Sequence, residues 1–281
     1  MFAEIADRNW LWAAAGLYLA GFVLGTVSLL RGGKPSDVAN YALIVAGYVL
    51  QFIGLGVRGH AIHGTPLGNA FELFQFTAWS AITLYLVIGV TFRNSMLGFF
   101  TSCLAATLTT VSLLIPAWDA ARTPIFSPNP WIELHAALAV FSYGVFALLS
   151  LTSVMFLARN YSLKSKQLGG WFSFLPSIID LDHIGVRLLG AGVVILTTAI
   201  GVILIYWVRD PSSANVTKIL MTVAVWVAYS ATLGLRLNGR LLAKRFAWTC
   251  LALFAFALIS LGPVDASRHP ATKRAALAAQ P

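Results

Sequence analysis

Charged side chains are scarce in this chain. Of its 281 residues only 10% are Asp, Glu, Lys or Arg, whereas 58% are hydrophobic, and the mean hydropathy is +0.80. A soluble globule of this composition would expose more apolar surface than water tolerates, so the composition excludes a soluble protein. It predicts a membrane protein.

Cysteine is also scarce, and the motifs of several chemistries are missing. Cys103 and Cys250 are the only cysteines; both fall within apolar runs and they form no C-x-x-C pair. Thiol exchange therefore has no evident site. The sequence contains no C-x-x-C-H, which would attach haem covalently, and no H-E-x-x-H, which would bind zinc. Since it also shows no nucleophile with a base, no phosphate loop and no carboxylate dyad, we do not expect an enzyme.

Long apolar runs are abundant. Eight of them reach about 18 residues, the length that crosses a hydrocarbon core, at 10–30, 38–57, 71–92, 96–117, 132–158, 184–208, 218–235 and 246–262. A spanning segment must satisfy its own backbone hydrogen bonds, and these runs lack the alternation of barrel strands, so we expect helices. The predicted fold is all-α, a polytopic membrane helix bundle of about eight transmembrane helices. We expect one domain over 1–270 and a disordered tail over 271–281.

Lysine and arginine gather in alternate loops. The odd-numbered loops hold ten of these residues and the even-numbered loops four. Because basic loops stay in the cytoplasm, we expect both termini and the loop at 58–70 to lie outside a bacterial-type cytoplasmic membrane. The formal net charge of +9 does not indicate a nucleic-acid partner, since the basic residues flank membrane spans, where anionic lipid headgroups attract them. The lipid bilayer is the expected partner.

Four of the five histidines fall on the predicted outer side. His60 and His63 lie in the second loop, His135 just inside the fifth span and His269 beyond the eighth, whereas His183 is on the cytoplasmic side. Imidazole binds iron and zinc, and two imidazoles can take both axial positions of a haem. Zinc is the weaker interpretation, because no cysteine is nearby. Two plainer alternatives stay open: loop histidines are usually only solvated, and His135 can simply be hydrogen-bonded between helices.

The loop and helix start RGHAIHGTPLGNAFELFQFTAWS, at 58–80, places a glutamate at the edge of the third span. Asn69 and Glu72 have the spacing of a capping box, which satisfies the first backbone N–H groups of a helix. An ionisable residue at this depth is equally typical of a functional site. The sequence leaves both interpretations open.

Over about residues 40–270 the sequence resembles the cytochrome c assembly, or CcsA/HemX-like, integral membrane proteins. The segment 58–80 is similar to the family's arginine, P-L-x-N-x-x-E core and following tryptophan, here Arg58, Pro66, Leu67, Asn69, Glu72 and Trp79. His135 is followed by Ser-Tyr at +7 and +8, as in the family. DLDHIGVRLLGAGVVILTTAIG (180–201) and WVAYSATLGLR (226–236) are similar to its later segments.

The resemblance implies a haem site on the outer side. His135 matches the family's external haem ligand, and His269 or His63 would be the opposite ligand. The implied cofactor is one haem b, bound without a covalent link, and the implied contacts also include His60, Trp207 and Asp210.

The sequence departs from the family at two places. In YWVRDPSSANVTK, Arg209 replaces the second tryptophan of the family's external W-x-W-D-P, so this haem platform is short and degraded. Gly234 stands where the family has a transmembrane histidine, so a second haem site inside the membrane is not expected.

Two functions therefore remain open. The first is a haem-handling protein of cytochrome c maturation, which holds haem at the outer membrane face for delivery to apocytochrome c, with another assembly membrane protein as a partner. The second, which the lost tryptophans favour, is a HemX-like regulatory or assembly partner in haem metabolism that carries no haem itself. A small-solute transporter is poorly supported, because the sequence predicts spans without buried charge pairs and without paired broken helices.

Overall fold

The computed structural model describes residues 2–31, 37–89, 95–120, 130–166, 175–209 and 216–266. In these ranges all regular secondary structure is helical, which confirms the predicted all-α class. The helices are α1 (Phe2–Leu30), α2 (Asp37–Ala61), α3 (Ala70–Gly89), α4 (Ser95–Leu114), α5 (Ala117–Ala120), α6 (Pro130–Lys164), α7 (Ile178–Arg209), α8 (Val216–Leu237) and α9 (Ala243–Ala266).

The long helices match the predicted spans. In the described part of the chain, seven of them, α1 to α4 and α6 to α8, are long and apolar enough to cross a membrane. The eighth predicted span, 246–262, falls within α9. The fourth ends earlier than predicted, at Leu114, because Pro116 has no N–H to continue the helix and disfavours helical geometry in the residue before it. The protein is a multi-pass integral membrane protein.

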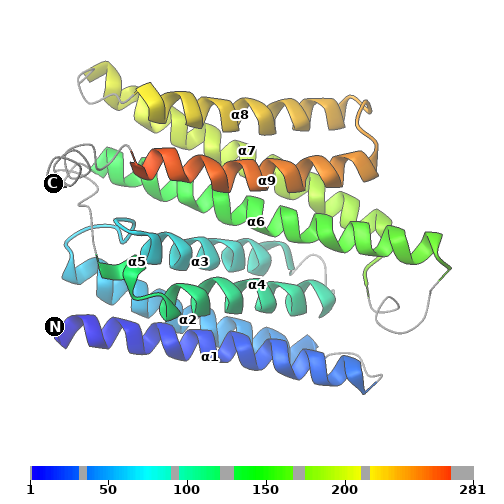
Figure 1. Cartoon of the computed structure of the whole chain (residues 1–281), viewed down its shortest axis with the longest axis horizontal. Helices are drawn as coiled ribbons and strands as arrows, with labels where there is room; N and C mark the ends of the chain where they lie inside the picture. Colours follow the sequence, from blue (N-terminus) through cyan, green and yellow to red (C-terminus); the bar gives the residue numbers. More distant parts are fainter. Residues whose placement is uncertain are drawn as a thin grey trace, which may run out of the picture.

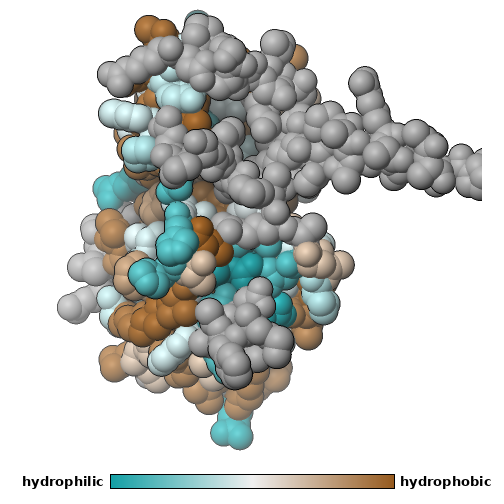
Figure 2. Space-filling model, turned by 90° about the vertical axis from the view of Figure 1, so that its left-hand side faces the viewer, coloured by the Kyte–Doolittle hydropathy of each residue, from teal (hydrophilic) through white to brown (hydrophobic). Residues whose placement is uncertain are grey.

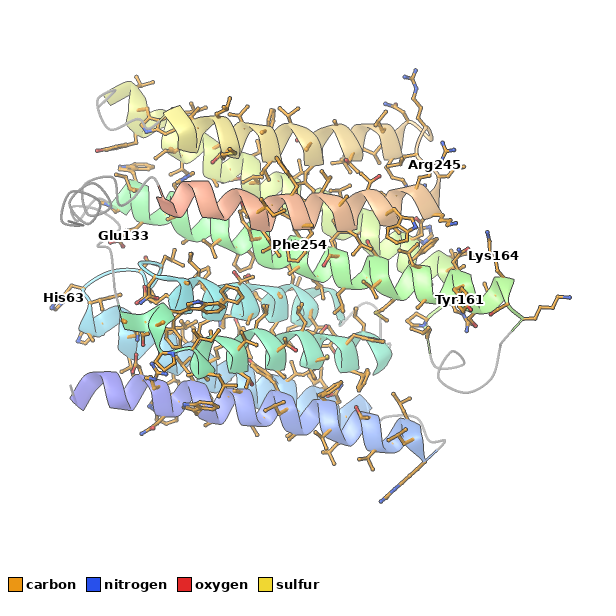
Figure 3. The ribbon with its side chains drawn as sticks, viewed as in Figure 1. His63, Glu133, Tyr161, Lys164, Arg245 and Phe254 are labelled. Atoms are coloured by element: carbon orange, nitrogen blue, oxygen red, sulfur yellow. The ribbon has the colours of Figure 1, made fainter. Side chains whose placement is uncertain are left out.

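The eight long helices lie side by side, with α6 in the middle of the bundle (Figure 1). On one side α1 packs against α2 and α4, and α3 packs against α4 and α6. On the other side α6 packs against α7 and α9, and α8 against the same two helices. Helix α1 begins and α9 ends at one end of the bundle, here called the His63 end, and the opposite end is called the Lys164 end (Figure 3).

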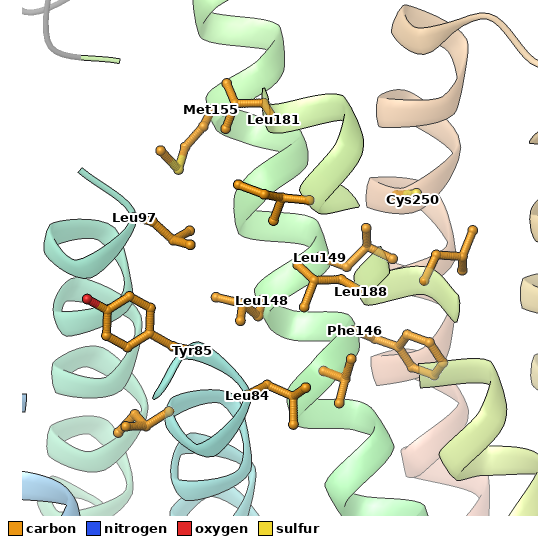
Figure 4. Packing of buried hydrophobic residues seen from close by; sticks show 14 of the residues in the cluster. Leu84, Tyr85, Leu97, Phe146, Leu148, Leu149, Met155, Leu181, Leu188 and Cys250 are labelled. Carbon is orange, nitrogen blue, oxygen red and sulfur yellow. The ribbon is translucent and has the colours of Figure 1, made fainter. Parts of the chain in front are cut away.

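Apolar side chains from α3, α4, α6, α7 and α9 fill the centre of the bundle (Figure 4). Leu148 and Leu149 of α6 are buried, as is Leu188 of α7. Phe146 stacks on Tyr229 with ring centroids 3.7 Å apart, which joins α6 to α8. The middle helix α6 therefore holds the two sides together through dispersion contacts, the main attraction between helices in lipid.

A glycine sets the distance between the two sides. A Cβ added to Gly144 of α6 would lie 1.7 Å from Ser80 Oγ and 2.7 Å from the Thr77 carbonyl oxygen, both on α3. Only a residue without a side chain allows so close an approach, as is common at packed membrane helices.

A buried polar network joins the helices before α6. Tyr18 donates a hydrogen bond to Gln51 at 3.0 Å, Gln51 donates to the Gln75 side chain at 2.9 Å, and Gln75 donates to Ser112 at 2.9 Å. These four residues come from α1, α2, α3 and α4. Because the bilayer core offers no water, each polar group must find a protein partner, and this requirement fixes the register of the four helices.

Candidate functional site

A buried arginine organises the His63 end. Arg58, in the last turn of α2, is only 8% exposed. Its Nε donates to Glu72 Oε1 at 2.7 Å and its Nη1 donates to Asp7 Oδ2 at 3.0 Å. Its Nη2 pairs with Asp119 of the short helix α5. One guanidinium thus binds carboxylates from α1, α3 and α5, and uses the planar fork that makes arginine suited to such sites.

Asp119 receives two further donors. Arg8 Nη1 lies 2.9 Å from Asp119 Oδ2, and Asn69 Nδ2 donates to Asp119 Oδ1 at 3.0 Å. These contacts attach α5 to the starts of α1 and α3. The ion cluster, Asp7, Arg8, Arg58, Glu72 and Asp119, has two guanidinium groups against three carboxylates and so carries a net charge of −1. Figure 2, which faces this end, shows hydrophilic residues gathered over the half formed by α1 to α5.

Glu72 combines the two roles that the sequence left open. Asn69 Oδ1 accepts the Glu72 backbone N–H at 2.9 Å, so Asn69 caps α3. The Glu72 carboxylate accepts the backbone N–H of Gly68 and also pairs with Arg58. Glu72 is therefore both part of the helix cap and the fully buried counter-ion of Arg58.

Buried charge pairs are present after all. The expectation that the spans lack them is wrong at the His63 end, as the Arg58 pairs show. A half-buried pair stands at the Lys164 end. There Arg236 of α8 pairs with Asp182 of α7 and lies over the Phe246 ring, with its guanidinium carbon 5.3 Å from the centroid. The sequence did not reveal these pairs because their members are far apart in the chain. Both pairs connect helices, which is a structural role, and neither lies in a broken helix of the kind that transporters use.

A cleft opens beside the ion cluster. It has a volume of about 470 Å³ and lies between the end of α2, the loop at 62–69, α3 and the start of α6. Its apolar walls include Phe52, Phe76 and Trp79. Among the described residues, the buried Trp79 Nε1–H has no hydrogen-bond partner.

His60 and His63 lie at the rim of this cleft. Both side chains are exposed, and their ring centroids are 6.4 Å apart. Across the cleft stands Glu133, whose carboxylate accepts a hydrogen bond from Thr65 at 3.2 Å. The described residues contain no group of three or more metal-ligating side chains, here or elsewhere. The two imidazoles at the rim therefore do not form part of a metal-binding group of three among the described residues.

His135 lies on another side of α6. Its Nδ1 is 2.8 Å from the carbonyl oxygen of Ala199 in α7, whereas Glu133 faces the loop at 62–69. A carbonyl only accepts, so Nδ1 carries the proton and donates it, and Nε2 keeps its lone pair. A hydrogen bond from the other ring nitrogen to a backbone carbonyl is the usual way in which a metal-binding histidine is oriented. The structure thus separates His135 from His60 and His63.

Of the remaining predicted site residues, Trp207 alone falls within the described ranges. Trp207 is in the last turn of α7, at the His63 end of the bundle. Asp210 and His269 lie outside the described residues, as does the tail at 271–281.

Sequence reasoning missed Asp7, Arg8 and Asp119. Each stands in a short polar stretch next to a span, where a charged residue is expected whatever it contacts. One signal was available in the sequence. Asp7 stands at the start of the first apolar run, and because an unpaired carboxylate is costly at the edge of a membrane span, Asp7 implies a charged partner.

The structure therefore defines a polytopic helical membrane protein with an ion cluster at one end and a histidine oriented between α6 and α7. Comparison with known families then settles the family. The model of the cytochrome c assembly protein family matches residues 67–263, and the chain belongs to this family.

Two relatives that match most of the chain are both named Protein HemX. The chain is 24% identical to Protein HemX of Brevibacillus brevis over 94% of its own length and 99% of that protein. It is 24% identical to Protein HemX of Bacillus subtilis (strain 168) over 87% and 90% of the two chains. A cytochrome c biogenesis protein CcsA of Microcystis aeruginosa is 27% identical over 54% of this chain and 47% of that protein.

Proposed function

We propose that the protein handles haem, holding one haem b without a covalent link at its outer face for delivery to apocytochrome c. Membership of the cytochrome c assembly family supports haem and apocytochrome c as the molecules involved. The observation that carries the proposal is the hydrogen bond from His135 Nδ1 to the Ala199 carbonyl, at 2.8 Å. It holds the ring still and leaves Nε2 in the unprotonated form that binds iron.

His269 is the second ligand in this proposal. It follows three residues after α9, which ends at the His63 end like the start of α6. His63 is less suited, because it borders the cleft on the α2 side while His135 contacts α7. Trp207, in the last turn of α7, and Asp210 would then border the haem. The chain acts as a carrier, and no residue is assigned a catalytic role.

The proposal also places the His63 end outside the cytoplasm. Lys164 and Arg245 lie at the opposite end (Figure 3), and Lys166, Arg240 and Lys244 are within five residues of one or the other in the chain. The excess of lysine and arginine identifies the cytoplasmic side of a membrane protein.

The test is a visible absorption spectrum of the protein purified in detergent from haem-replete cells. We expect a Soret band typical of low-spin haem, which needs two strong axial ligands. His135→Gly should abolish that band or convert it to a high-spin form, and added imidazole should restore it by filling the vacated position. His183→Ala is the matched control, because His183 is exposed near the start of α7, at the Lys164 end.

Two results would refute the haem proposal. One is a wild-type protein that shows no Soret band and takes up no added haem. The other is a His135→Gly protein with an unchanged spectrum, which would show that another residue binds the haem iron.

The extent of the matches supports a second function. The match covers 99% and 90% of the lengths of the two HemX proteins, but 47% of the length of CcsA of Microcystis aeruginosa. Here the protein is a HemX-like membrane partner that influences haem metabolism or the assembly of a complex without carrying haem. Absence of bound haem, together with altered cytochrome c or haem levels in a deletion strain, would favour this function.

A further inference from the structure

The cleft beside the ion cluster faces the lipid. Helices α3 and α6 touch at Ser80 and Gly144, and the cleft lies between them and α2 on the His63 side of that contact. The α2 wall looks outward, since Phe52 is 58% exposed and Gly56 is exposed with open space where a Cβ would stand. The cleft is therefore open sideways, to the leaflet on the His63 side.

The interior of the cleft suits a hydrocarbon chain. Trp79 forms its inner wall and packs against Phe52 and Phe76, with ring centroids 6.0 and 5.5 Å apart. Aromatic rings of this kind offer a large apolar surface. A ligand with an apolar chain matches this wall.

The charge around the rim selects the polar part of that ligand. Among the described residues, Glu133 is the one Asp, Glu, Lys or Arg side chain that lines the cleft, and the nearby ion cluster carries −1. Such a rim disfavours an anionic headgroup, and it disfavours the carboxylates of a porphyrin for the same reason. It favours a headgroup that ends in an ammonium, which Glu133 can bind.

We propose that this cleft binds one phospholipid with a primary amine headgroup, phosphatidylethanolamine. Its ammonium lies at Glu133, and His60 and His63 at the rim donate to its phosphate. One acyl chain lies against Phe52, Phe76 and Trp79. The lipid completes the packing between α2 and α6 at this end. This site lies on the opposite side of α6 from His135 and does not depend on the proposed haem function.

Native mass spectrometry of the full-length protein in mild detergent tests the site. The wild type, purified from membranes that contain phosphatidylethanolamine, should retain one molecule of it. Gly56→Leu should lose that molecule, because the new side chain enters the cleft and has no neighbour to displace. Gly201→Leu is the matched control, since Gly201 of α7 also has open space around its Cβ position and does not line the cleft.

A second variant tests the headgroup. With equal amounts of phosphatidylethanolamine and phosphatidylglycerol added, the wild type should prefer the amine lipid, and Glu133→Gln should lower that preference by about threefold, the effect of one partly exposed ion pair. The proposal is overturned if Gly56→Leu retains the lipid as the wild type does, or if the wild type prefers phosphatidylglycerol. It is also overturned if Gly56→Leu loses bound haem and keeps the phospholipid, because the cleft would then be a haem site.

Discussion

Replacing Arg58 by methionine removes the cation that three carboxylates share. Asp119 keeps Arg8 at 2.9 Å, but Glu72 and Asp7 lose their guanidinium partner, while the backbone N–H groups of Gly68 and Arg8 still donate to them. Glu72 has no exposed surface and Asp7 is 1% exposed, so water cannot replace the lost charge. Breaking a buried ion pair in this way costs about 3 to 5 kcal/mol of the free energy of unfolding. We expect the loss of unfolding free energy in Arg58→Met to fall in this range.

The free energy is measurable by titrating the detergent-purified protein with sodium dodecyl sulfate and following helix content by circular dichroism. Arg31→Met is the matched control, because Arg31 follows α1 at its other end and is exposed. Glu72→Gln keeps an acceptor for the Gly68 N–H and weakens one charged hydrogen bond, at a cost of about 2 kcal/mol. The double variant should lose less than the sum of the two single losses, since the residues contact each other.

A loss below about 1 kcal/mol for Arg58→Met would refute the reasoning, because that is the value of an exposed ion pair. Strict additivity of Arg58→Met and Glu72→Gln would refute it too. It would mean that Arg58 and Glu72 do not form the buried contact at 2.7 Å.

Three further predictions concern packing, backbone and topology. Gly144→Ala should cost at least about 2 kcal/mol in the same titration, since its Cβ would lie 1.7 Å from Ser80 Oγ, whereas Gly16→Ala, with nothing within 4 Å, should cost nothing. Gly239→Ala should cost about 1 kcal/mol because Gly239 has φ +68°, and an equal loss for the neighbouring Asn238→Ala would contradict this cause. Alkaline phosphatase fused after residue 270 should be active and after residue 242 inactive; the reverse pattern would invert the proposed orientation.

Most of the fold was predictable because the bilayer imposes it. A run of about 20 apolar residues without charge has one stable conformation in lipid, so the span at 38–57 could be assigned as a helix from sequence alone. The order in which helices pack was not predictable. It depends on features such as Gly144 against Ser80, and nothing in the sequence around a glycine says which side chain another helix will bring against it.

The candidate site was predictable in its local part and not in its long-range part. Asn69 and Glu72 are three residues apart, and the cap they form follows from that spacing. The counter-ions of Arg58 are 14, 51 and 61 residues away, so sequence spacing carries no information about them. His135 was identified through its resemblance to a family pattern, but the direction of its ring depends on Ala199 of another helix, which no local motif encodes.

The last prediction assigns different roles to the histidines on the two sides of α6: His135 to haem, and His60 and His63 to the phospholipid. Glu133 faces the cleft that His60 and His63 border, while His135, two residues later, contacts α7, because successive helical residues turn by about 100°. The double variant His60→Ala, His63→Ala should therefore leave any Soret band unchanged and lower only phospholipid retention. His135→Ala should do the opposite. If the double variant loses haem as His135→Ala does, the histidines share one site, and the separation of a lipid cleft from a haem ligand across α6 is wrong.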